Sequence, residues 1–325
     1  MSKTSTEPVR HALNGPTMGT RWSALFFAAP GFDAGATRKA LQSAVDEVDA
    51  QMSTWKPDSD LMRLNRAPAG QRVAVPAMLM EVLKLALAVG RASDGAFDIA
   101  VGDAVSAWGF GPDAAAPDLI RTAMTARRLP AHEAIDLGSG TVRKRVPIAL
   151  DLNGIAKGFG VDRLAETLTQ LGVGDALVGI DGEMRAMGSR PDGEAWTVAV
   201  ERPDRDRRAP HSVISLQDCA VATSGDYRHW VEVRGKRLSH TMDPRRGAPL
   251  LGAPASVTVL APSCAAADAW ATALMVLGPG KGGEVARRAG IDALFLLRDE
   301  ADSIRTCRVG PVFAQGEPAR ATAGD

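Results

Sequence analysis

The pattern of apolar residues changes near residue 134, and this change decides the fold class. Before it, apolar residues recur at helical spacing in three stretches, which predict helices at 33–52, 77–92 and 117–128. After it, short segments rich in β-forming residues dominate, and only two further helices are expected, at 155–171 and 265–277. Short strands grouped with a few long helices are typical of an α+β protein, since a parallel fold would alternate them regularly. We therefore expect mixed or antiparallel sheets flanked by helices.

The expected strands are short, and the two ends of the chain are expected to be loose. Residues 1–14 predict a flexible N-terminus, and the Gly-, Pro- and Ala-rich residues 311–325 predict a loose tail. One strand precedes the first helix. The strands lie at 20–29, 134–137, 146–150, 175–180, 183–187, 196–200, 212–216, 230–233, 256–260 and 292–297.

Charge and hydropathy exclude several classes of protein. Lys+Arg and Asp+Glu both number 38, so the net charge is zero, whereas a nucleic-acid-binding domain normally carries a basic excess. No apolar run reaches the roughly 20 residues that a membrane-spanning helix needs. Residues 1–16 contain no apolar stretch, so neither a secretory signal nor a lipoprotein anchor is predicted. We expect a cytoplasmic protein, or a periplasmic one if a leader is missing from the sequence.

The stretch 263–278, SCAAADAWATALMVLG, predicts an apolar helix with a single charged residue, Asp268. A carboxylate on so apolar a helix is costly unless something compensates its charge. Thr272 follows one turn later on the same face, and Ser263 is the better candidate for the helix cap. A carboxylate and a hydroxyl on one face suit a hard cation such as Mg²⁺. The alternative is a buried aspartate satisfied by a neighbouring backbone group or arginine.

Two further segments carry candidate chemistry. In ALDLNGIAKGFGVD (149–162) a strand is expected to end at Asp151, and glycines lead into a helix whose free N–H groups and Lys157 suit a phosphate. Neither the P-loop nor the dinucleotide glycine spacing is present, so a plain strand-to-helix turn remains the alternative. In the segment 222–249, His240 and Asp243 precede a DPRRG turn. The alternative to a functional role for His240 is a structural one, as is common for a histidine at the end of a strand.

Eight segments in order together resemble the ApbE family, the FAD:protein FMN transferases. The resemblance covers roughly residues 15–300, and it implies one transferase domain of two lobes over 15–310 with an FAD cleft between them. The matching segments are GPTMGTRW (15–22), MSTWKPDSDLMRLN (52–65), GAFDIAVG (95–102), DLNGIAKGFGVD (151–162), DGEMRAMG (181–188), ATSGDYR (222–228), SHTMDPRRG (239–247) and ADAWATALMVLG (267–278).

The resemblance also implies a role for individual residues. Mg²⁺ would be held by Asp268, Thr272 and the backbone carbonyl of Gly154. His240 matches a histidine near the reacting phosphates, and His240 and Asp268 are the expected catalytic residues. The residues expected to contact FAD are Met18, Trp55, Ala96, Phe97, Asp98, Asp151, Lys157 and Met242.

The reaction implied by the resemblance is Mg²⁺-dependent covalent flavinylation of a protein. A Ser or Thr hydroxyl of an acceptor flavoprotein attacks the phosphorus on the FMN side of FAD, and AMP leaves. The family's acceptor motif is of the type Ser/Thr-Gly-Ala-Ser/Thr. This chain offers only Asp94-Gly95-Ala96-Phe97, so we expect it to modify another protein.

Two alternatives stay open. The first is an FAD pyrophosphatase that releases FMN and AMP, with water as the nucleophile. The second is a non-enzymatic flavin-binding maturation accessory protein. The pairing of Asp268 with Thr272 argues against the second, because a carrier needs no metal.

Overall fold

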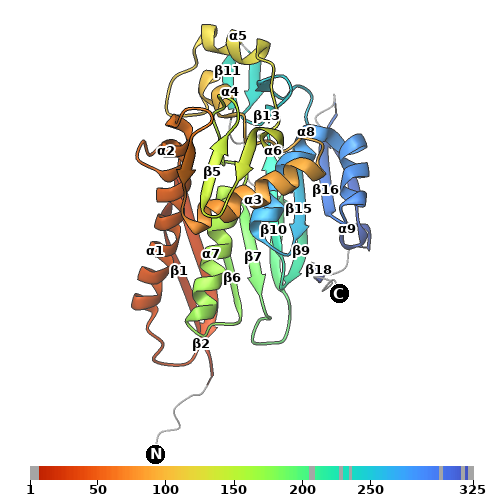
Figure 1. Ribbon diagram of the computed structural model, residues 1–325. Coiled ribbons are helices and arrows are strands. Elements are labelled where there is room, and N and C mark those ends of the chain that lie inside the picture. The colour runs from red at the N-terminus through yellow and green to blue at the C-terminus, as the bar shows by residue number, and fades with distance from the viewer. Residues whose placement is uncertain are drawn as a thin grey trace, which may run out of the picture.

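An eight-stranded antiparallel sheet forms the centre of the protein in a computed structural model (Figure 1). The structure describes residues 7–204, 209–226, 230–233, 236–299, 303–315 and 319–320. The strands, in their order across the sheet, are β1 (Val9–Thr17), β2 (Thr20–Ala28), β6 (Ala176–Ile180), β7 (Glu183–Met187), β10 (Ala220–Gly225), β15 (Ser256–Ala261), β16 (Asp292–Arg298) and β17 (Ile304–Val309). The predicted α+β class is confirmed.

Long helices cover one face of this sheet (Figure 1). They are α1 (Ala34–Met52), α7 (Ala156–Gln170) and α8 (Cys264–Arg288), and α3 (Ala77–Ala92) packs on α8 and α1. The Asp33 carboxylate caps α1 by accepting the N–H of Ala36 at 2.8 Å, and the Ser263 hydroxyl caps α8. The backbone of Gly278 leaves helical geometry at φ 68°, so α8 bends where the sequence predicted its end and then continues to Arg288.

A smaller three-stranded sheet covers the other face. It consists of β8 (Trp196–Glu201), β9 (Pro210–Gln217) and β18 (Ala319–Arg320), and the short helix α9 (Pro311–Gln315) packs beside it. The alternation of side chains along β2 serves both layers. Trp22, Ala24 and Phe26 face the helices, whereas Leu25 and Phe27 face the smaller sheet.

The remaining elements form the part of the molecule drawn at the top and centre of Figure 1. The short helices are α2 (Asp60–Arg66), α4 (Gly102–Ala107), α5 (Pro117–Thr125) and α6 (Ala131–Ala134). The strands are β3 (Arg72–Ala74), β4 (Ile135–Leu137), β5 (Thr141–Lys144), β11 (Trp230–Val233), β12 (Lys236–Ser239), β13 (Met242–Asp243) and β14 (Ala248–Pro249). Apolar residues of α4, α5, β13 and β14 share a small core, which places Met242 beside the site.

Three local predictions are wrong. Residues 9–14 are not flexible, because β1 pairs with β2 along its length through a tight turn at Met18 and Gly19, both with positive φ. Residues 311–315 form a helix that buries Phe313, although much of the tail beyond them lies outside the described residues. Residues 146–150 are no strand, because the Ala149 carbonyl accepts the N–H of Gly102 instead of a sheet partner.

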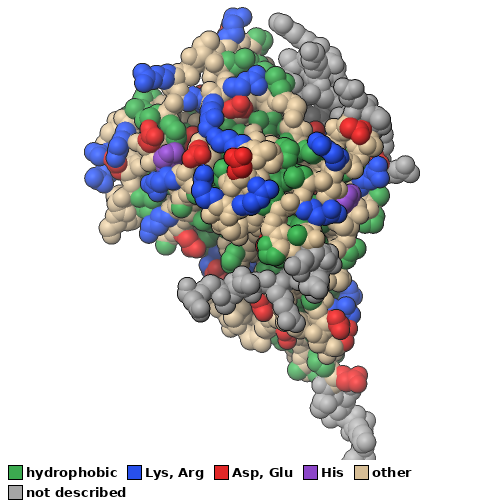
Figure 2. Space-filling model, turned by 90° about the vertical axis from the view of Figure 1, so that its right-hand side faces the viewer, with side chains coloured by type: hydrophobic (Ala, Val, Ile, Leu, Met, Phe, Trp, Pro, Cys, Tyr) green, Lys and Arg blue, Asp and Glu red, His purple; other side chains and the backbone are tan. Residues whose placement is uncertain are grey.

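Basic and acidic side chains are mixed over the face shown in Figure 2, in keeping with the zero net charge. Among the described residues, no helix combines the length and the apolar character needed to span a membrane.

Candidate active site

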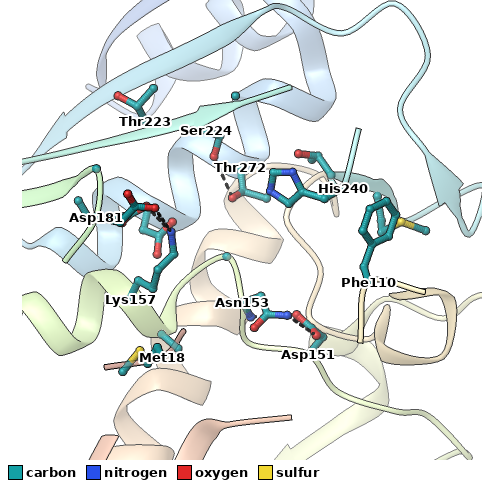
Figure 3. A pocket seen from close by; sticks show the side chains of 18 of the residues that line it. Met18, Phe110, Asp151, Asn153, Lys157, Asp181, Thr223, Ser224, His240 and Thr272 are labelled. Atoms are coloured by element: carbon teal, nitrogen blue, oxygen red, sulfur yellow. Dashed lines mark hydrogen bonds and ion pairs between the residues drawn. The ribbon is translucent and has the colours of Figure 1, made fainter. Parts of the chain in front are cut away.

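One cavity of about 960 Å³ collects the residues that the sequence predicted for the site. It lies where the start of α7, the middle of α8, the β6–β7 turn and the loop before α4 meet (Figure 3). Every predicted site residue lines it, although their contacts with ligands stay predictions. These residues are Met18, Trp55, Ala96, Phe97, Asp98, Asp151, Gly154, Lys157, His240, Met242, Asp268 and Thr272.

Asp268 is a buried carboxylate in the second turn of α8. Its Oδ2 accepts the backbone N–H of Gly158 at 3.1 Å, which joins α8 to the first turn of α7. Burial raises the pKa of Asp268 to about 7, and the nearby Glu183 carboxylate adds to this while Lys157 opposes it. A bound cation would relieve this cost, because it would compensate the negative charge directly.

The start of α7 differs from the predicted anion site. The N–H of Gly158 is donated to Asp268, and the N–H of Ala156 is donated to the Leu152 carbonyl at 2.9 Å. The sequence had suggested that these N–H groups are free to bind a phosphate, but both are used within the protein. The side chain of Lys157 is the remaining candidate for a phosphate contact at this helix start.

Lys157 contacts carboxylates that the sequence analysis did not select. Its Nζ donates to Glu183 Oε1 at 2.9 Å and lies 4.0 Å from Asp181 Oδ2. Burial by itself would lower the pKa of Lys157, but the carboxylates of Glu183 and Asp268 outweigh it and raise this pKa. The sequence did carry a signal for these partners of Lys157, namely the two acidic residues of the DGE segment. In the structure Glu183 is buried in a strand that is otherwise half-apolar.

The donor set fits Mg²⁺. Lys157 is the only Lys or Arg among the described residues that line the cavity, and it faces three carboxylates, those of Asp181, Glu183 and Asp268. The described residues contain no group of three His, Cys, Asp or Glu side chains arranged to hold a metal. The donors that the resemblance implies are the Asp268 carboxylate, the Thr272 hydroxyl and the Gly154 carbonyl, and all three are hard oxygens of the kind that Mg²⁺ prefers.

Gly154, in the turn before α7, and Thr272 of α8 lie in close contact. A Cβ at Gly154 would lie 3.0 Å from Thr272 Oγ1 and 3.2 Å from Phe97 Cε2, so a larger side chain would occupy the space beside the hydroxyl. Thr272 Oγ1 also lies 3.3 Å from Ser224 Oγ of β10 (Figure 3). His240 lines the same cavity, and its ring lies 6.4 Å from the ring of Phe110 between centroids.

The remaining wall residues divide into apolar surfaces and buried carboxylates. Phe97 and Met242 are buried, whereas Trp55 is 61% exposed at the rim and offers an indole face to a planar ring. Asp98 Oδ1 accepts the backbone N–H groups of Ala100 and Ala131, so this oxygen holds two loops together.

Asp151 is a second buried carboxylate with a perturbed pKa. Its two oxygens accept the backbone and side-chain N–H groups of Asn153 at 2.9 and 3.0 Å. Burial raises the pKa of Asp151 to about 6, and the backbone N–H of Asn153 opposes this shift. The cavity therefore has two acidic groups that titrate near neutral pH.

Comparisons with known proteins agree with this geometry. The family model described as the ApbE family matches residues 18–295. A Vibrio cholerae protein named FAD:protein FMN transferase is 40% identical over 296 residues, covering 89% of this chain and 87% of that protein. The solved flavin transferase ApbE from Vibrio cholerae superposes with a TM-score of 0.82 at 34% identity, covering 93% of this chain and 97% of the other. The apo flavinyl transferase ApbE from Pseudomonas stutzeri also gives 0.82 at 34% identity, covering 95% and 96%. Since the match spans most of the sequence and the whole cavity, this chain belongs to the ApbE family.

Proposed function

We propose that this protein transfers FMN from FAD to a Ser or Thr hydroxyl of an acceptor protein and releases AMP. The observation that carries the proposal is the meeting of Lys157, Asp268 and Thr272 on one cavity in a chain of the ApbE family. The cavity volume of about 960 Å³ is at the upper end of the range for small-molecule sites, which suits a dinucleotide as large as FAD.

The reaction transfers the phosphoryl group of the FMN half of FAD to the acceptor hydroxyl. The acceptor oxygen forms a bond to the phosphorus of the FMN half, and the bond from that phosphorus to the bridging oxygen breaks. AMP leaves with the bridging oxygen, and an imidazole nitrogen of His240 takes the proton of the hydroxyl. This role is supported by the place of His240 on the wall of the same cavity as Lys157, Asp268 and Thr272.

The cavity residues bind and orient the FAD pyrophosphate. The Lys157 ammonium, held by Glu183, attracts the phosphates and stabilises the charge that develops on the leaving AMP. Mg²⁺ bound through Asp268, Thr272 and the Gly154 carbonyl would neutralise charge on the phosphoryl oxygens. The buried Phe97 and Met242 exclude water from the site, which favours transfer over hydrolysis.

A single assay tests the proposal. Purified protein is incubated with FAD, Mg²⁺ and a peptide or domain that carries a Ser/Thr-Gly-Ala-Ser/Thr motif, and the acceptor is weighed by mass spectrometry. We expect an adduct of the mass of FMN less water, together with one AMP per adduct. AMP release without an adduct, at the same rate with and without acceptor, would show a pyrophosphatase instead.

The acceptor also decides where the reaction takes place. Assays of cytoplasmic and periplasmic fractions from cells expressing the protein would assign one of the two expected compartments.

A further inference from the structure

The hydroxyl of Thr272 has an unusual partner for a threonine in a helix. Threonine side chains on helices often donate to the carbonyl four residues earlier, and several in this protein do so. Thr122, Thr167 and Thr169 donate to the carbonyls of Asp118, Arg163 and Ala165 at 3.0, 2.8 and 3.1 Å. Thr272 does not follow them, because its hydroxyl shares a hydrogen bond with Ser224 Oγ at 3.3 Å.

The geometry points to Ser224 as a positioning residue for Thr272, and this inference rests on the proposed function. Thr272 has two common rotamers in a helix, one of which directs the hydroxyl back to its own helix. The hydrogen bond with Ser224 favours a conformation in which the hydroxyl points towards β10, and Thr272 lines the cavity there (Figure 3). Ser224 therefore acts on the metal ligand and need not touch the metal itself.

The chemistry of a hydroxyl ligand requires such a partner. A threonine that binds a cation offers a lone pair of its oxygen, so its proton must point to another acceptor. Ser224 Oγ lies within hydrogen-bond distance of Thr272 Oγ1, and since either hydroxyl can donate in this pair, it can serve as that acceptor. On another side of Thr272 Oγ1, the Cα of Gly154 approaches so closely that a Cβ would lie 3.0 Å away. The ligand oxygen is thus fixed between β10 and the start of α7.

The strand geometry makes Ser224 suited to this role. Side chains alternate along β10, so Thr223 and Ser224 point to opposite faces of the sheet. Thr223 Oγ1 pairs with Thr258 Oγ1 of β15 at 2.9 Å, away from Thr272. The Thr223–Thr258 pair therefore provides a matched control at Thr258. Although Thr223 lines the cavity, Thr258 does not, and the pair has no hydrogen bond to the proposed metal ligand.

The test measures metal binding directly. Mn²⁺ is titrated by electron paramagnetic resonance into the full chain with ADP, which supplies a pyrophosphate but no transferable FMN. We expect Ser224→Ala to weaken Mn²⁺ binding by about 10-fold, as partners of metal ligands typically do. Ser224→Thr keeps the hydroxyl and should restore binding to within about 3-fold of the native protein. Thr258→Val should leave it unchanged, although it lowers thermal stability.

Two results would overturn the inference. The first is native Mn²⁺ affinity in Ser224→Ala, and the second is absence of Mn²⁺ binding by the native protein. If Ser224→Ala does not fold, Ser224→Cys preserves the volume with a much weaker acceptor and should show the same loss. The Mn²⁺ titration does not depend on flavin transfer, so failure of the transferase assay alone would refute only the proposed function.

Discussion

Asp151 and Asp268 are buried carboxylates on the wall of the cavity. Burial raises the pKa of Asp151 to about 6 and that of Asp268 to about 7. Buried carboxylates with shifted pKa values destabilise the folded protein, and they are concentrated at sites that bind a ligand or carry out catalysis. Each accepts a hydrogen bond from a nearby backbone N–H, from Asn153 and from Gly158 respectively, so both are held in place before any ligand binds.

Asp268→Asn should abolish flavin transfer while preserving the fold. The amide oxygen can still accept the N–H of Gly158, but the negative charge that holds the cation is lost. We expect the rate of adduct formation to fall by about 100-fold or more. Asp292→Asn is the matched control, because Asp292 accepts the Val312 N–H away from the cavity. A rate near that of the native protein in Asp268→Asn would contradict the metal assignment.

Asp151 should make the ligand-free protein less stable as the pH rises from about 4 to 6. A raised pKa means that the folded state binds the proton more tightly than the unfolded chain. The stability from that bound proton is complete below the unfolded pKa and is lost as the pH passes the folded value. The loss is of the order of 3 kcal/mol. Urea unfolding at pH 4.5 and 7.5 measures the part of this loss that falls above pH 4.5, about 2 kcal/mol, and Asp151→Asn should reduce the difference by about that amount. An unchanged difference would assign the pH dependence to other groups.

Helices α7 and α8 meet so closely that only glycine fits between them. A Cβ on Gly158 would lie 2.4 Å from the backbone oxygen of Cys264, a distance that no ordinary contact allows. Asp162 of α7 reinforces this junction, because its carboxylate accepts the N–H groups of Cys264 and Ala265 at 2.9 Å. The contact brings Lys157 and Asp268 to the same cavity, so the packing of two helices forms the site.

Gly158→Ala should therefore damage both stability and activity. The added methyl forces the two helices apart, which typically costs about 1–3 kcal/mol, and the Gly158–Asp268 hydrogen bond is lost with it. Chemical unfolding and the flavin-transfer assay measure the two effects. Gly174→Ala is the control, since its Cβ meets no atom within 4 Å and its backbone is not left-handed. Equal stability of the two variants would refute the close contact.

The cavity draws its walls from segments spread over most of the chain, from Met18 in the first hairpin to Thr272 in the last long helix. A hydrogen bond from Trp108 Nε1 to the Gly247 carbonyl at 3.0 Å links two of these segments, α4 and the β13–β14 turn. A ligand in the cavity would therefore contact elements that are distant in sequence. Its binding free energy is added to the stability of the whole fold.

FAD with Mg²⁺ should raise the thermal midpoint of the full chain. At about 100 times the dissociation constant, a ligand of the folded state adds about 2.7 kcal/mol, which corresponds to several degrees for a chain of this size. Differential scanning fluorimetry detects the shift. A chelator should remove the part due to the cation and stop flavin transfer. A midpoint that is the same with and without ligand would show that the cavity does not hold FAD.

Much of this architecture followed from local patterns. The helix at 77–92 and the strand at 183–187 coincide with their predicted bounds, because each has a clear periodicity over its length. The Asp268–Thr272 face was equally visible, since residues four apart on a helix are neighbours in any fold. Segments without such periodicity were missed, among them β10, which carries Ser224.

The sequence by itself determined the fold class and most of the long helices, and with the family resemblance it selected twelve of the residues that line the cavity. Only the tertiary structure decided how those residues are used. Asp268 takes the N–H of Gly158 from 110 positions away, and Glu183 holds Lys157 from another element. Such contacts depend on how helices and strands pack, which no local spacing encodes. For the same reason two N–H groups at the start of α7 are donated within the protein, to Asp268 and to the Leu152 carbonyl, and Lys157 is the charged side chain that a phosphate would meet there.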